Sequence, residues 1–419
     1  MTTPSPDCRF CGTALTETVV DLGKSPLCET FLTPDQVREM ECFYPLHAFV
    51  CSECFLVQLE EFVAPAEIFR EYAYFSSFSD AWLEHCKSYV ETMTDRLSLD
   101  RDSMVVELAS NDGYLLQYFV ERGIPVLGVE PALNVAKVAE EKGIPTRTEF
   151  FGKEFAASLA NEGVQADLVL GNNVMAQVPD LNDFVGGIPM ILAPHGTVTI
   201  EFPHLMHTLD ENQFDQIYHE HFSYFSLVTT ERIFAAHGLR LYDVDELWTH
   251  GGSIRIHACH EAHDRPETDR LRALRAKEIE IGTETLDYYR SFARRVEGLR
   301  RDILSFLIAA KNDGKRVVGY GAPGKGNTLL NYCGIRSDLI EFTVDRNPYK
   351  HGRFTPGTHI PIHPPEKLDE EDVDVVFILP WNLTDEIMAQ LSHLADRGTT
   401  FVRPVPALTV LEASKVGSS

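Results

Sequence analysis

Two short cysteine pairs near the N-terminus place the strongest constraint on how this chain folds. Residues 8–11 read Cys-Arg-Phe-Cys, and residues 51–54 read Cys-Ser-Glu-Cys. Each C-x-x-C turn presents two thiolates to one side of a tetrahedron, so two turns complete an all-cysteine shell for Zn²⁺. Four thiolates leave no open coordination position, which favours a structural zinc over a catalytic one. The predicted ligands are Cys8, Cys11, Cys51 and Cys54.

The spacing between the two pairs favours a small independent domain over a compact finger. Residues 12–50 separate the pairs, which is longer than the usual gap of roughly 15–20 residues. Gly12 directly follows the first pair and allows the tight turn that such a site needs. We therefore expect a zinc-binding domain over residues 1–68. Two unrelated buried or redox-active cysteine pairs are the alternative.

The composition is that of a globular enzyme with an acidic surface. The chain has 419 residues, enough for two or three domains, and a formal charge of −26. This charge argues against nucleic acids and anionic membranes as partners, because both bind basic surfaces. The sequence has no apolar run of about 20 residues to span a membrane, and its N-terminus lacks signal-peptide features. The chain has nine cysteines, and the five outside the two pairs are scattered along the sequence. Because this is not the pattern of a disulfide-bonded protein, we expect a reducing, cytoplasmic environment.

Alternating strand and helix signals predict two α/β domains. In the first domain, apolar runs read as parallel strands that are buried on both faces. These runs cover 104–108, 126–129, 168–171 and 196–201. We expect this central Rossmann-like domain to span residues 69–262.

The second predicted α/β domain begins with a charged amphipathic stretch over 266–312, which reads as a long helical region. Strand signals follow it at 316–319, 342–344 and 373–379. We expect a C-terminal Rossmann-like domain over residues 263–410. The predicted fold class is thus α/β, with the zinc-binding module in front of the two Rossmann-like domains.

A polar turn follows the first strand of the central domain and predicts a ligand site. The strand carries Glu107 near its end, and the turn reads Ala-Ser-Asn-Asp-Gly before a helix begins. Small residues let a ligand approach the backbone, and a helix N-terminus offers free N–H groups. Glu130 ends the next strand, where a carboxylate can accept hydrogen bonds from both hydroxyls of a ribose.

The acidic character of this turn favours S-adenosylmethionine (SAM) over a dinucleotide. The turn lacks G-x-G-x-x-G, and Glu107 and Asp112 would repel a pyrophosphate. SAM carries a positive sulfur and no phosphate, so an acidic turn suits it. A nucleotide-binding or purely structural α/β unit is the alternative. The predicted cofactor-binding residues are Glu107, Ala109, Asn111, Gly113, Tyr114, Glu130, Pro131, Asn172 and Asn173.

A dense cluster of polar aromatic, histidine and acidic residues lies at 218–224, which reads Tyr-His-Glu-His-Phe-Ser-Tyr. The i, i+2 spacing of His219 and His221 would place both on one side of a strand. The zinc-protease pattern H-E-x-x-H is absent. We therefore favour a general base, a histidine oriented by a carboxylate and phenols, over a metal site. A hydrogen-bonded structural network is the alternative.

With these motifs in view, the chain resembles the sugar C-methyltransferases of antibiotic biosynthesis, which act on TDP-linked 4-keto-deoxyhexoses. The resemblance covers nearly the whole chain, and its motifs are specific in combination. Besides the cysteine pairs and residues 218–224, they are Tyr-Phe-Ser-Ser-Phe-Ser-Asp at 74–80, Glu-Leu-Ala-Ser-Asn-Asp-Gly-Tyr at 107–114, Gly-Val-Glu-Pro at 128–131, Thr-His-Gly-Gly-Ser at 249–253, Gly-Tyr-Gly-Ala-Pro-Gly-Lys-Gly-Asn-Thr at 319–328 and Val-Asp-Arg-Asn-Pro at 344–348.

The resemblance implies that a base removes a proton next to the ketone, usually at C3, and that SAM methylates the enolate. By resemblance His221 is the base, and Tyr218 and Glu220 orient it or the sugar. Tyr72 is expected to hydrogen-bond the substrate oxygen, and Tyr224 to contact the sugar. The expected partner is a TDP-linked keto-deoxysugar, and the chain itself is expected to be a monomer or a weak homo-oligomer. O-methylation is also open, because the SAM turn says nothing about the acceptor.

One position departs from the pattern that the resemblance predicts. We expect a histidine after Asn-Val-x-Ala, but the chain has Gln177 there. Glutamine can hydrogen-bond a substrate but cannot shuttle a proton at neutral pH. The change implies a different substrate, reliance on His221 alone, or altered chemistry, and a neutral substitution is the alternative. A second interpretation of the whole chain is an NAD(P)H-dependent ketoreductase, alone or combined with methylation, acting on the same sugar.

A second glycine-rich loop, at 319–328, follows a strand and precedes a helix. It approaches the P-loop pattern, but Gly326 stands where the Mg²⁺-binding hydroxyl should be. We expect Lys325, Asn327 and Arg346 to hold the diphosphate of the sugar nucleotide, with the active site in a cleft between the α/β domains. A nicotinamide site with Asp345 at the ribose is one alternative. A degenerate nucleotide fold that only packs is the other.

Overall fold

The structure is a computed structural model that describes residues 6–64, 76–78 and 80–411. The chain forms two compact units, each assembled from separated stretches. The first unit comprises residues 1–17, 50–205 and 220–286, and the second comprises 18–49, 206–219 and 287–419. The predicted domain boundaries at 68 and 262 remain predictions.

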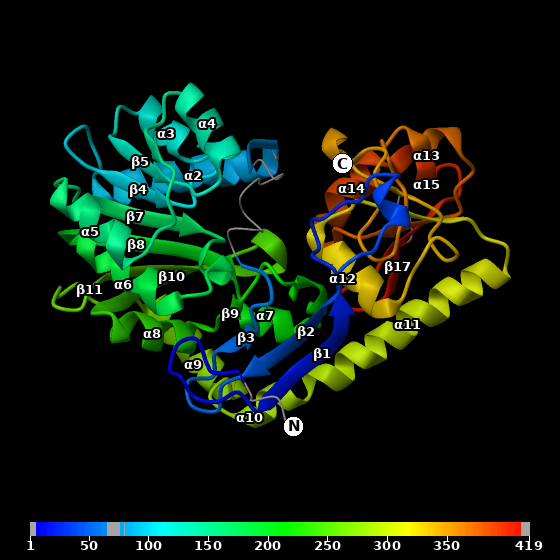
Figure 1. The fold of residues 1–419 in the computed structure, drawn as a ribbon, viewed down its shortest axis with the longest axis horizontal. Coiled ribbons are helices and arrows are strands. Elements are labelled where there is room, and N and C mark those ends of the chain that lie inside the picture. The colour runs from blue at the N-terminus through cyan, green and yellow to red at the C-terminus, as the bar shows by residue number, and fades with distance from the viewer. Residues whose placement is uncertain (1–5, 65–75, 79, 412–419) are drawn as a thin grey trace. The chain divides into compact units, whose positions relative to one another are not determined.

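A seven-stranded sheet forms the centre of the first unit, in the order β10-β11-β8-β7-β4-β5-β6. The predicted strands are present, and β4 to β8 are mutually parallel. Figure 1 shows β5, β4, β7 and β8 following one another in this order. Two strands that were not predicted, β10 and β11, extend the sheet as antiparallel neighbours. The strands are β4 Val105–Leu108, β5 Val126–Val129, β6 Thr146–Arg147, β7 Ala166–Asn172, β8 Leu192–Pro203, β10 Leu239–Leu247 and β11 Ser253–His260.

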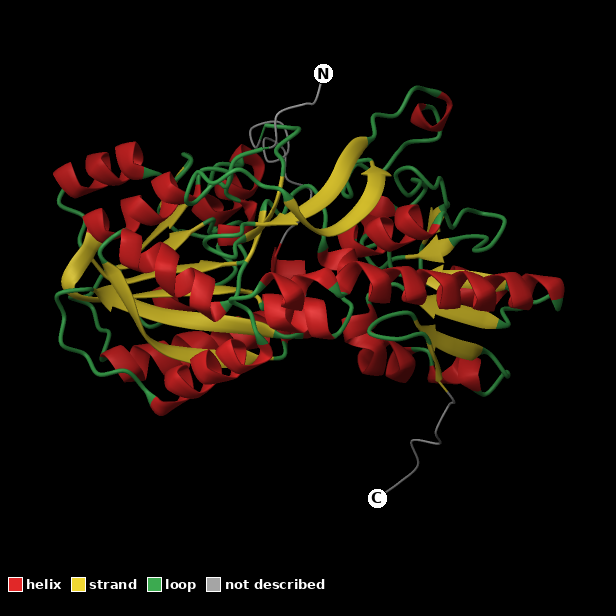
Figure 2. Cartoon of the chain, turned by 90° about the horizontal axis from the view of Figure 1, so that it is seen from below, coloured by secondary structure: helices red, strands yellow, loops and turns green. Residues whose placement is uncertain are grey.

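Helices cover both faces of this sheet, as its apolar strands require (Figure 2). One core cluster packs Tyr89 and Met93 of the first long helix against Phe119 and against Val105 of β4. The helices of the first unit are α2 Asp80–Leu97, α3 Leu116–Glu121, α4 Leu133–Glu141, α5 Lys153–Asn161, α6 Leu181–Ile191, α8 Leu227–Ala236 and α9 Asp269–Ile281.

A buried carboxylate joins three of these elements. Both oxygens of Glu278 on α9 accept backbone N–H groups at the start of α8, from Leu227 at 2.7 Å and from Val228 at 2.9 Å. The His204 Nε2, just beyond β8, lies 2.5 Å from the same carboxylate. The negative charge therefore caps a helix N-terminus, where free N–H groups and the helix dipole favour it.

The second unit also has a parallel-rich sheet, in the order β14-β13-β12-β15-β16-β17. Counted along the chain, this is the strand order of a Rossmann fold. Its core packs Val318, Val344, Ile378 and Phe401 together. The strands are β12 Val317–Tyr320, β13 Thr343–Val344, β14 Ile362–His363, β15 Val375–Ile378, β16 Thr400–Arg403 and β17 Thr409–Leu411. The helices are α7 Leu205–Asp210, α11 Phe292–Asn312, α12 Gly324–Cys333, α13 Lys367–Glu370, α14 Thr384–Gln390 and α15 Ser392–Ala395.

The N-terminal strands contribute to both units. The second unit contains β1 Glu17–Ser25, apart from its first residue, and β2 Tyr44–Val50, apart from its last. In the first unit, β3 Val57–Leu59 pairs antiparallel with β9 Ser223–Tyr224. The fold class predicted from the sequence, a zinc-binding module followed by two Rossmann-like α/β domains, is confirmed.

The long helical stretch predicted over 266–312 is helical, but it consists of three helices. The chain breaks there into α9, the short α10 Leu286–Arg290 and α11. Gly282 ends α9 because it takes a left-handed conformation with φ of 94°, while its N–H still bonds to the Glu278 and Ile279 carbonyls. Among the described residues no helix is both long enough and apolar enough to cross a membrane.

Candidate functional site

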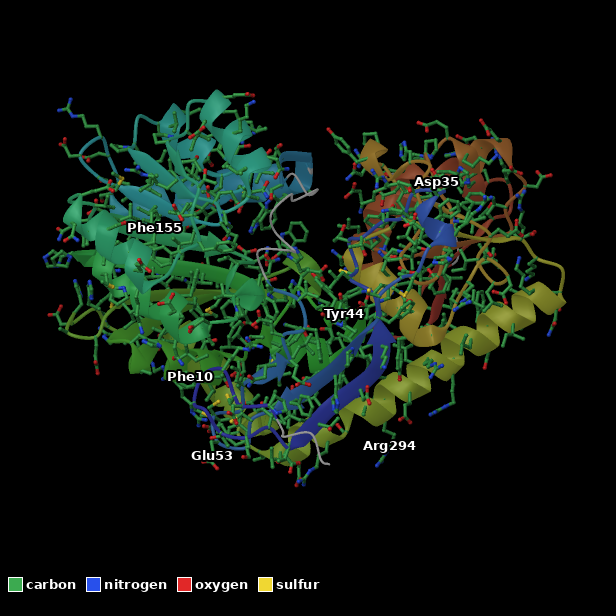
Figure 3. The ribbon with its side chains drawn as sticks, in the orientation of Figure 1. Phe10, Asp35, Tyr44, Glu53, Phe155 and Arg294 are labelled. Carbon is green, nitrogen blue, oxygen red and sulfur yellow. The ribbon has the colours of Figure 1, made fainter. Side chains whose placement is uncertain are left out.

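The four predicted zinc ligands come together in the first unit. The Sγ atoms of Cys8 and Cys54 lie 3.6 Å apart, those of Cys11 and Cys51 lie 3.4 Å apart, and all four fall within 4.8 Å of one another. A tetrahedral zinc with bonds of about 2.3 Å needs sulfur separations of about 3.8 Å. Figure 3 labels Phe10 and Glu53, one from each C-x-x-C turn, in the corner where these sulfurs lie. The donor set and its spacing fit Zn²⁺.

Positive φ angles and backbone hydrogen bonds hold the two C-x-x-C turns in a tight conformation. Gly12 and Phe55 have positive φ angles, 74° and 61°, and their N–H groups bond to the carbonyls of Cys8 and Cys51. The Gln58 amide donates to the Cys8 Sγ at 3.2 Å and accepts from the Arg9 N–H at 2.9 Å. Gln58 thus orients the predicted zinc ligand Cys8 through a hydrogen bond. No sequence pattern predicted this role.

The predicted SAM turn lies between β4 and α3, and its backbone takes unusual conformations. Ala109, Asn111 and Gly113 all have positive φ, at 58°, 48° and 75°. A Cβ on Gly113 would come within 2.2 Å of the Ile144 side chain, so this position needs glycine. The Glu130 carboxylate accepts the Asn111 N–H at 2.9 Å and the Ala132 N–H at 2.8 Å. Glu130 therefore holds the turn in place, and each carboxylate oxygen keeps a second lone pair for a ligand.

Buried acceptors without donors gather at the carboxyl ends of β4 and β7. Within the described part of the chain, the Oδ1 atoms of Asp112 and Asn173 have no hydrogen-bond partner, and the buried Glu107 carboxyl group lies next to the Tyr114 hydroxyl. Burial raises the pKa of Glu107 well above its usual value. Burial likewise raises the pKa of the neighbouring Tyr114 hydroxyl. Such unpaired acceptors suit a ligand that carries positive charge and N–H donors, as SAM does.

Other predicted cofactor residues surround this turn. The backbone N–H of Ser76 donates to the Asn111 Oδ1 at 3.1 Å, so the segment before α2 covers the turn. Asn172, at the end of β7, is half-buried, as are Asn173 and Pro131. Each therefore leaves part of its side chain accessible at this edge of the sheet.

His221 lies in a buried segment that two neighbours hold in place. The Phe222 N–H donates to the Ala176 carbonyl at 2.7 Å, and the Leu59 N–H donates to the Phe222 carbonyl at 3.0 Å. Only 7% of His221 is exposed, and its ring meets that of Tyr224 edge-on with centroids 6.2 Å apart. Gln177 ends the short 3-10 helix Met175–Gln177 that carries Ala176 and is half-buried. The structure thus brings the segments of His221 and Gln177 together.

The strand expected through His219 and His221 was wrong, because His219 and Glu220 form a turn and β9 begins only at Ser223. The His219 Nε2 bonds to the Pro45 carbonyl at 3.1 Å, and burial lowers the pKa of this histidine. His219 is therefore a structural residue of the second unit.

The remaining predicted catalytic residues do not belong to one unit. Tyr218 belongs to the second unit, whereas Glu220, which is 5% exposed, begins the next stretch of the first. Tyr72 lies outside the described residues.

Residues Cys28 and Glu29 of the same chain pack against the second glycine loop. The Glu29 carboxylate accepts the backbone N–H of Gly324 at the start of α12. A Cβ on Gly324 would lie 2.8 Å from the Cys28 Sγ and 2.8 Å from the Glu29 Oε1. The Asn327 amide donates to the Cys28 carbonyl at 2.6 Å. A carboxylate and its flanking residue thus fill the place where a phosphate would bind.

Lys325 points into a polar cluster of the second unit. Its Nζ lies 4.2 Å from the centre of the Trp381 ring and bonds to the Asn382 side chain. The Trp381 Nε1 donates to Asp215 at 2.6 Å. Burial lowers the pKa of Lys325 to about 8 and raises that of Asp215 to about 6. The Lys325 charge is therefore partly compensated inside the domain.

The other polar residues near this loop differ in exposure. The side chain of Arg346 is 61% exposed and pairs with Glu386 at 3.4 Å. Asp345 accepts the backbone N–H groups of Ala322 at 2.7 Å and Asn347 at 2.8 Å. The Asp345 carboxylate therefore stabilises the loop backbone. A nicotinamide site would use this same carboxylate to bind the ribose.

A buried charge cluster at the end of β8 was missed by the sequence analysis. Glu201, fully buried, contacts the Arg255 Nη2 at 2.5 Å and the His85 Nε2 at 3.0 Å, and accepts the Thr249 hydroxyl at 2.9 Å. Burial would raise the pKa of Glu201, but Arg255 and His85 outweigh it and lower the pKa to about 2. The signal in the sequence that could have indicated this cluster is Glu201 itself, an acidic residue at the end of the predicted apolar strand 196–201.

Comparison with known proteins covers almost the whole chain. Three family models match in succession, described as a zinc binding domain at 8–69, a methyltransferase domain at 82–244 and a C-methyltransferase C-terminal domain at 248–406. C-methyltransferase NovU of Streptomyces niveus is 36% identical over 410 residues, which is 98% of either chain.

Solved structures resemble parts of the chain more distantly. A SAM-dependent methyltransferase from Clostridium acetobutylicum matches 42% of this chain and 92% of its own, at 11% identity and a TM-score of 0.35. Magnesium protoporphyrin IX methyltransferase from Synechocystis matches 42% of this chain and 83% of its own, at 14% identity and a TM-score of 0.34. The assignment therefore rests on the family models and the relative, and the chain belongs to the SAM-dependent C-methyltransferases that carry an N-terminal zinc-binding domain.

Proposed function

We propose that the methyl acceptor is a TDP-linked 4-keto-deoxyhexose and that methylation takes place at C3, next to the ketone. The observation that carries this proposal is the buried His221 segment, which is fastened to the end of β3 and to the 3-10 helix of Gln177. It combines a histidine with a neighbouring acid and a phenol, the groups that carbon deprotonation requires. The motif resemblance to sugar C-methyltransferases supports the sugar and the TDP group.

In this proposal His221 takes the proton from C3. The electron pair of the broken C–H bond enters the new C=C bond of the enolate, whose negative charge rests on the oxygen at C4. Glu220 and Tyr218 orient the base or the sugar, Tyr224 contacts the sugar, and Tyr72 hydrogen-bonds its oxygen. S-adenosylmethionine, when bound, supplies an electrophilic methyl group on a positively charged sulfur. A base on a backbone segment that is fixed by hydrogen bonds favours this chemistry because little reorganisation is needed.

The predicted cofactor residues have separate proposed roles. Asp112 provides a buried, unpaired acceptor oxygen for the ammonium group, and Glu107, next to the Tyr114 hydroxyl, lines the same side of the turn. Glu130 binds the ribose hydroxyls while it holds the turn through Asn111. Gln177 hydrogen-bonds the sugar in place of a proton-transferring histidine.

For the diphosphate we propose graded contributions from three residues of the second unit. Arg346 has the exposed side chain and is the direct contact. Lys325, held between Trp381 and Asn382, adds positive potential. Asn327 contributes by holding the Cys28 carbonyl.

The ketoreductase alternative has less support. A nicotinamide dinucleotide in the second unit needs the helix N-terminus of α12 for its pyrophosphate, and the Glu29 carboxylate bonds to Gly324 there. The geometry of the loop therefore argues against hydride transfer from this unit.

The proposal is tested by product analysis with SAM and a panel of TDP-4-keto-deoxyhexoses. We expect a product heavier by one methylene whose new methyl group is bonded to carbon. A methyl ether would instead indicate O-methylation. The absence of transfer to any panel member that binds would contradict the proposed substrate class.

A further inference from the structure

The motif Thr-His-Gly-Gly-Ser at 249–253 forms a strained loop in the first unit. His250 has φ of 55° and ψ of 17°, in the left-handed region that side chains other than glycine seldom adopt. Gly251 and Gly252 follow with φ of 88° and 113°. Conformations of this kind persist where the surroundings fix them, and they concentrate at functional sites.

Hydrogen bonds fix both ends of this loop. The Thr249 hydroxyl donates to Glu201 at 2.9 Å, and the Ser253 hydroxyl donates to the Thr249 carbonyl at 2.9 Å. The Gly252 carbonyl accepts the His204 N–H at 3.0 Å. Glu201 is itself held by Arg255 and His85, so one end of the loop is bonded to a buried cluster of charged side chains.

The loop lies at the carboxyl edge of the parallel strands. Ser253 begins β11 directly opposite Pro203, the last residue of β8, so the residues before Ser253 extend past the end of β8. The cofactor turn lies at the same edge, because β4 and β8 run parallel within one sheet. Figure 1 shows the ends of β7 and β8 on one side of the first unit.

The same strand end also connects to the segment of the proposed base. His204 forms a parallel bridge with Phe225, and the Leu205 N–H donates to the Phe225 carbonyl at 2.9 Å. Phe225 follows the His221–Tyr224 segment directly. The end of β8 therefore carries the His250 loop through one bond and the His221 segment through another.

The His250 side chain is exposed at this edge and is oriented by an aromatic neighbour. Its ring meets the Trp82 ring edge-on with centroids 5.8 Å apart. Trp82 stacks on His85 with centroids 5.1 Å apart and lies 6.0 Å from Tyr114 of the cofactor turn. The imidazole is thus connected to the cofactor turn through Trp82 and is still reachable by a ligand.

We propose that His250 is a further catalytic residue, which contacts the acceptor and donates a hydrogen bond to the oxygen that gains negative charge. This inference rests on the proposed function, because it assigns the second of two groups to the same deprotonation. His221 takes the C3 proton, and the His250 N–H stabilises the enolate oxygen without transferring its own proton. His85, Glu201 and Arg255 are positioning residues that act through Thr249.

The test uses the backbone strain, because glycine fits the left-handed conformation better than histidine does. The full-length variants His250→Gly and His250→Asn are compared with wild type and with His359→Gly. His359 is a matched control: it has φ of 54° and its imidazole pairs with Glu41 at 3.0 Å in the second unit. The measurements are solvent deuterium exchange at C3 without SAM, single-turnover methyl transfer with SAM, SAM affinity by calorimetry, and Tm.

We expect His250→Gly to keep its Tm and SAM affinity while exchange and transfer both fall by about 100-fold or more, the effect of one lost donor at a developing oxyanion. His250→Asn should recover part of both rates, since asparagine tolerates this conformation and its amide donates. His359→Gly should keep both rates.

Two results would overturn the proposal. Rates in His250→Gly within about three-fold of wild type would exclude a catalytic contact. A loss of SAM affinity equal to the loss of rate would place His250 at the cofactor instead. The failure of the proposed function is a separate outcome, because wild type itself would then show neither exchange nor transfer.

Discussion

The Glu29 carboxylate accepts the backbone N–H of Gly324, so the phosphate position of the second glycine loop is filled by a residue almost 300 positions earlier in the chain. The Cys28 carbonyl on the same segment is held by the Asn327 amide. A loop that looks like a nucleotide cradle thus binds its own carboxylate. This relationship argues against a pyrophosphate bound directly at the N-terminus of α12.

We predict that the wild-type protein neither binds NADPH saturably nor oxidises it in the presence of a TDP-keto-sugar. The reason is that a pyrophosphate would have to displace the Glu29 carboxylate from the Gly324 N–H. NADPH fluorescence and absorbance measure binding and oxidation, and a SAM titration of the same sample serves as the control. Saturable NADPH binding at micromolar concentrations would show that the loop is open.

The zinc site gives a prediction about stability. Cys8→Ser should remove the bound zinc and lower both solubility and Tm, because a closed thiolate shell contributes folding free energy. Cys42→Ser is the control, since Cys42 is exposed and lies outside the four-cysteine cluster. Elemental analysis together with thermal unfolding measures both effects. A folded, zinc-free Cys8→Ser protein with unchanged Tm would contradict a structural site.

Glu130 has a predicted role in SAM affinity. Glu130→Ala should weaken SAM binding by roughly 1–3 kcal/mol, because it removes acceptors for the ribose and also frees the Asn111 N–H. Isothermal titration measures this change. Glu141→Ala, on the exposed face at the end of α4, should bind SAM as wild type does. If Glu130→Ala binds SAM with unchanged affinity, the SAM ribose does not bind at Glu130.

Glu201 predicts a specific pH dependence of stability. The pKa of Glu201 is lowered to about 2, so its stabilising effect is complete above the ordinary value of 4.5 and disappears as pH falls from there towards 2. The shift corresponds to about 3 kcal/mol at neutral pH. Glu201→Gln should therefore be less stable than wild type at pH 7, and the gap should narrow as pH falls below about 4.5.

Chemical denaturation at several pH values tests this dependence. Glu141→Gln is the matched control, because the side chain of Glu141 is 66% exposed and forms only a long surface contact with Lys137. A gap between Glu201→Gln and wild type that stays constant over this range would show that the carboxylate charge does not provide the stability.

The sequence predicted those parts of the fold that depend on local pattern. The strands β4, β5, β7 and β8 were found because a strand that is buried on both faces is apolar throughout. The zinc ligands were found because a C-x-x-C turn is local. Gly282, which breaks the long helical stretch, was also visible, but its left-handed conformation depends on how the chain packs after α9.

The parts that were missed depend on contacts between residues that are distant in sequence. Nothing near Gly324 indicates that Glu29 binds it, and nothing near Thr249 indicates that Glu201 lies beneath it. His219 reads like a catalytic residue beside His221, yet its bond to Pro45 makes it structural. The contact of His219 with Pro45 is visible only in the folded chain.

The most direct test of the account compares His221→Ala with wild type and with His219→Gln. Each protein is given ¹³C-methyl SAM and a TDP-4-keto-deoxyhexose in heavy water, and NMR locates the label. The account predicts a C3 methyl group with wild type and His219→Gln. It predicts a rate about 10²–10⁴-fold lower for His221→Ala, whose SAM affinity should be unchanged. Methylation of oxygen by wild type, or transfer by His221→Ala at a near-normal rate, would contradict it.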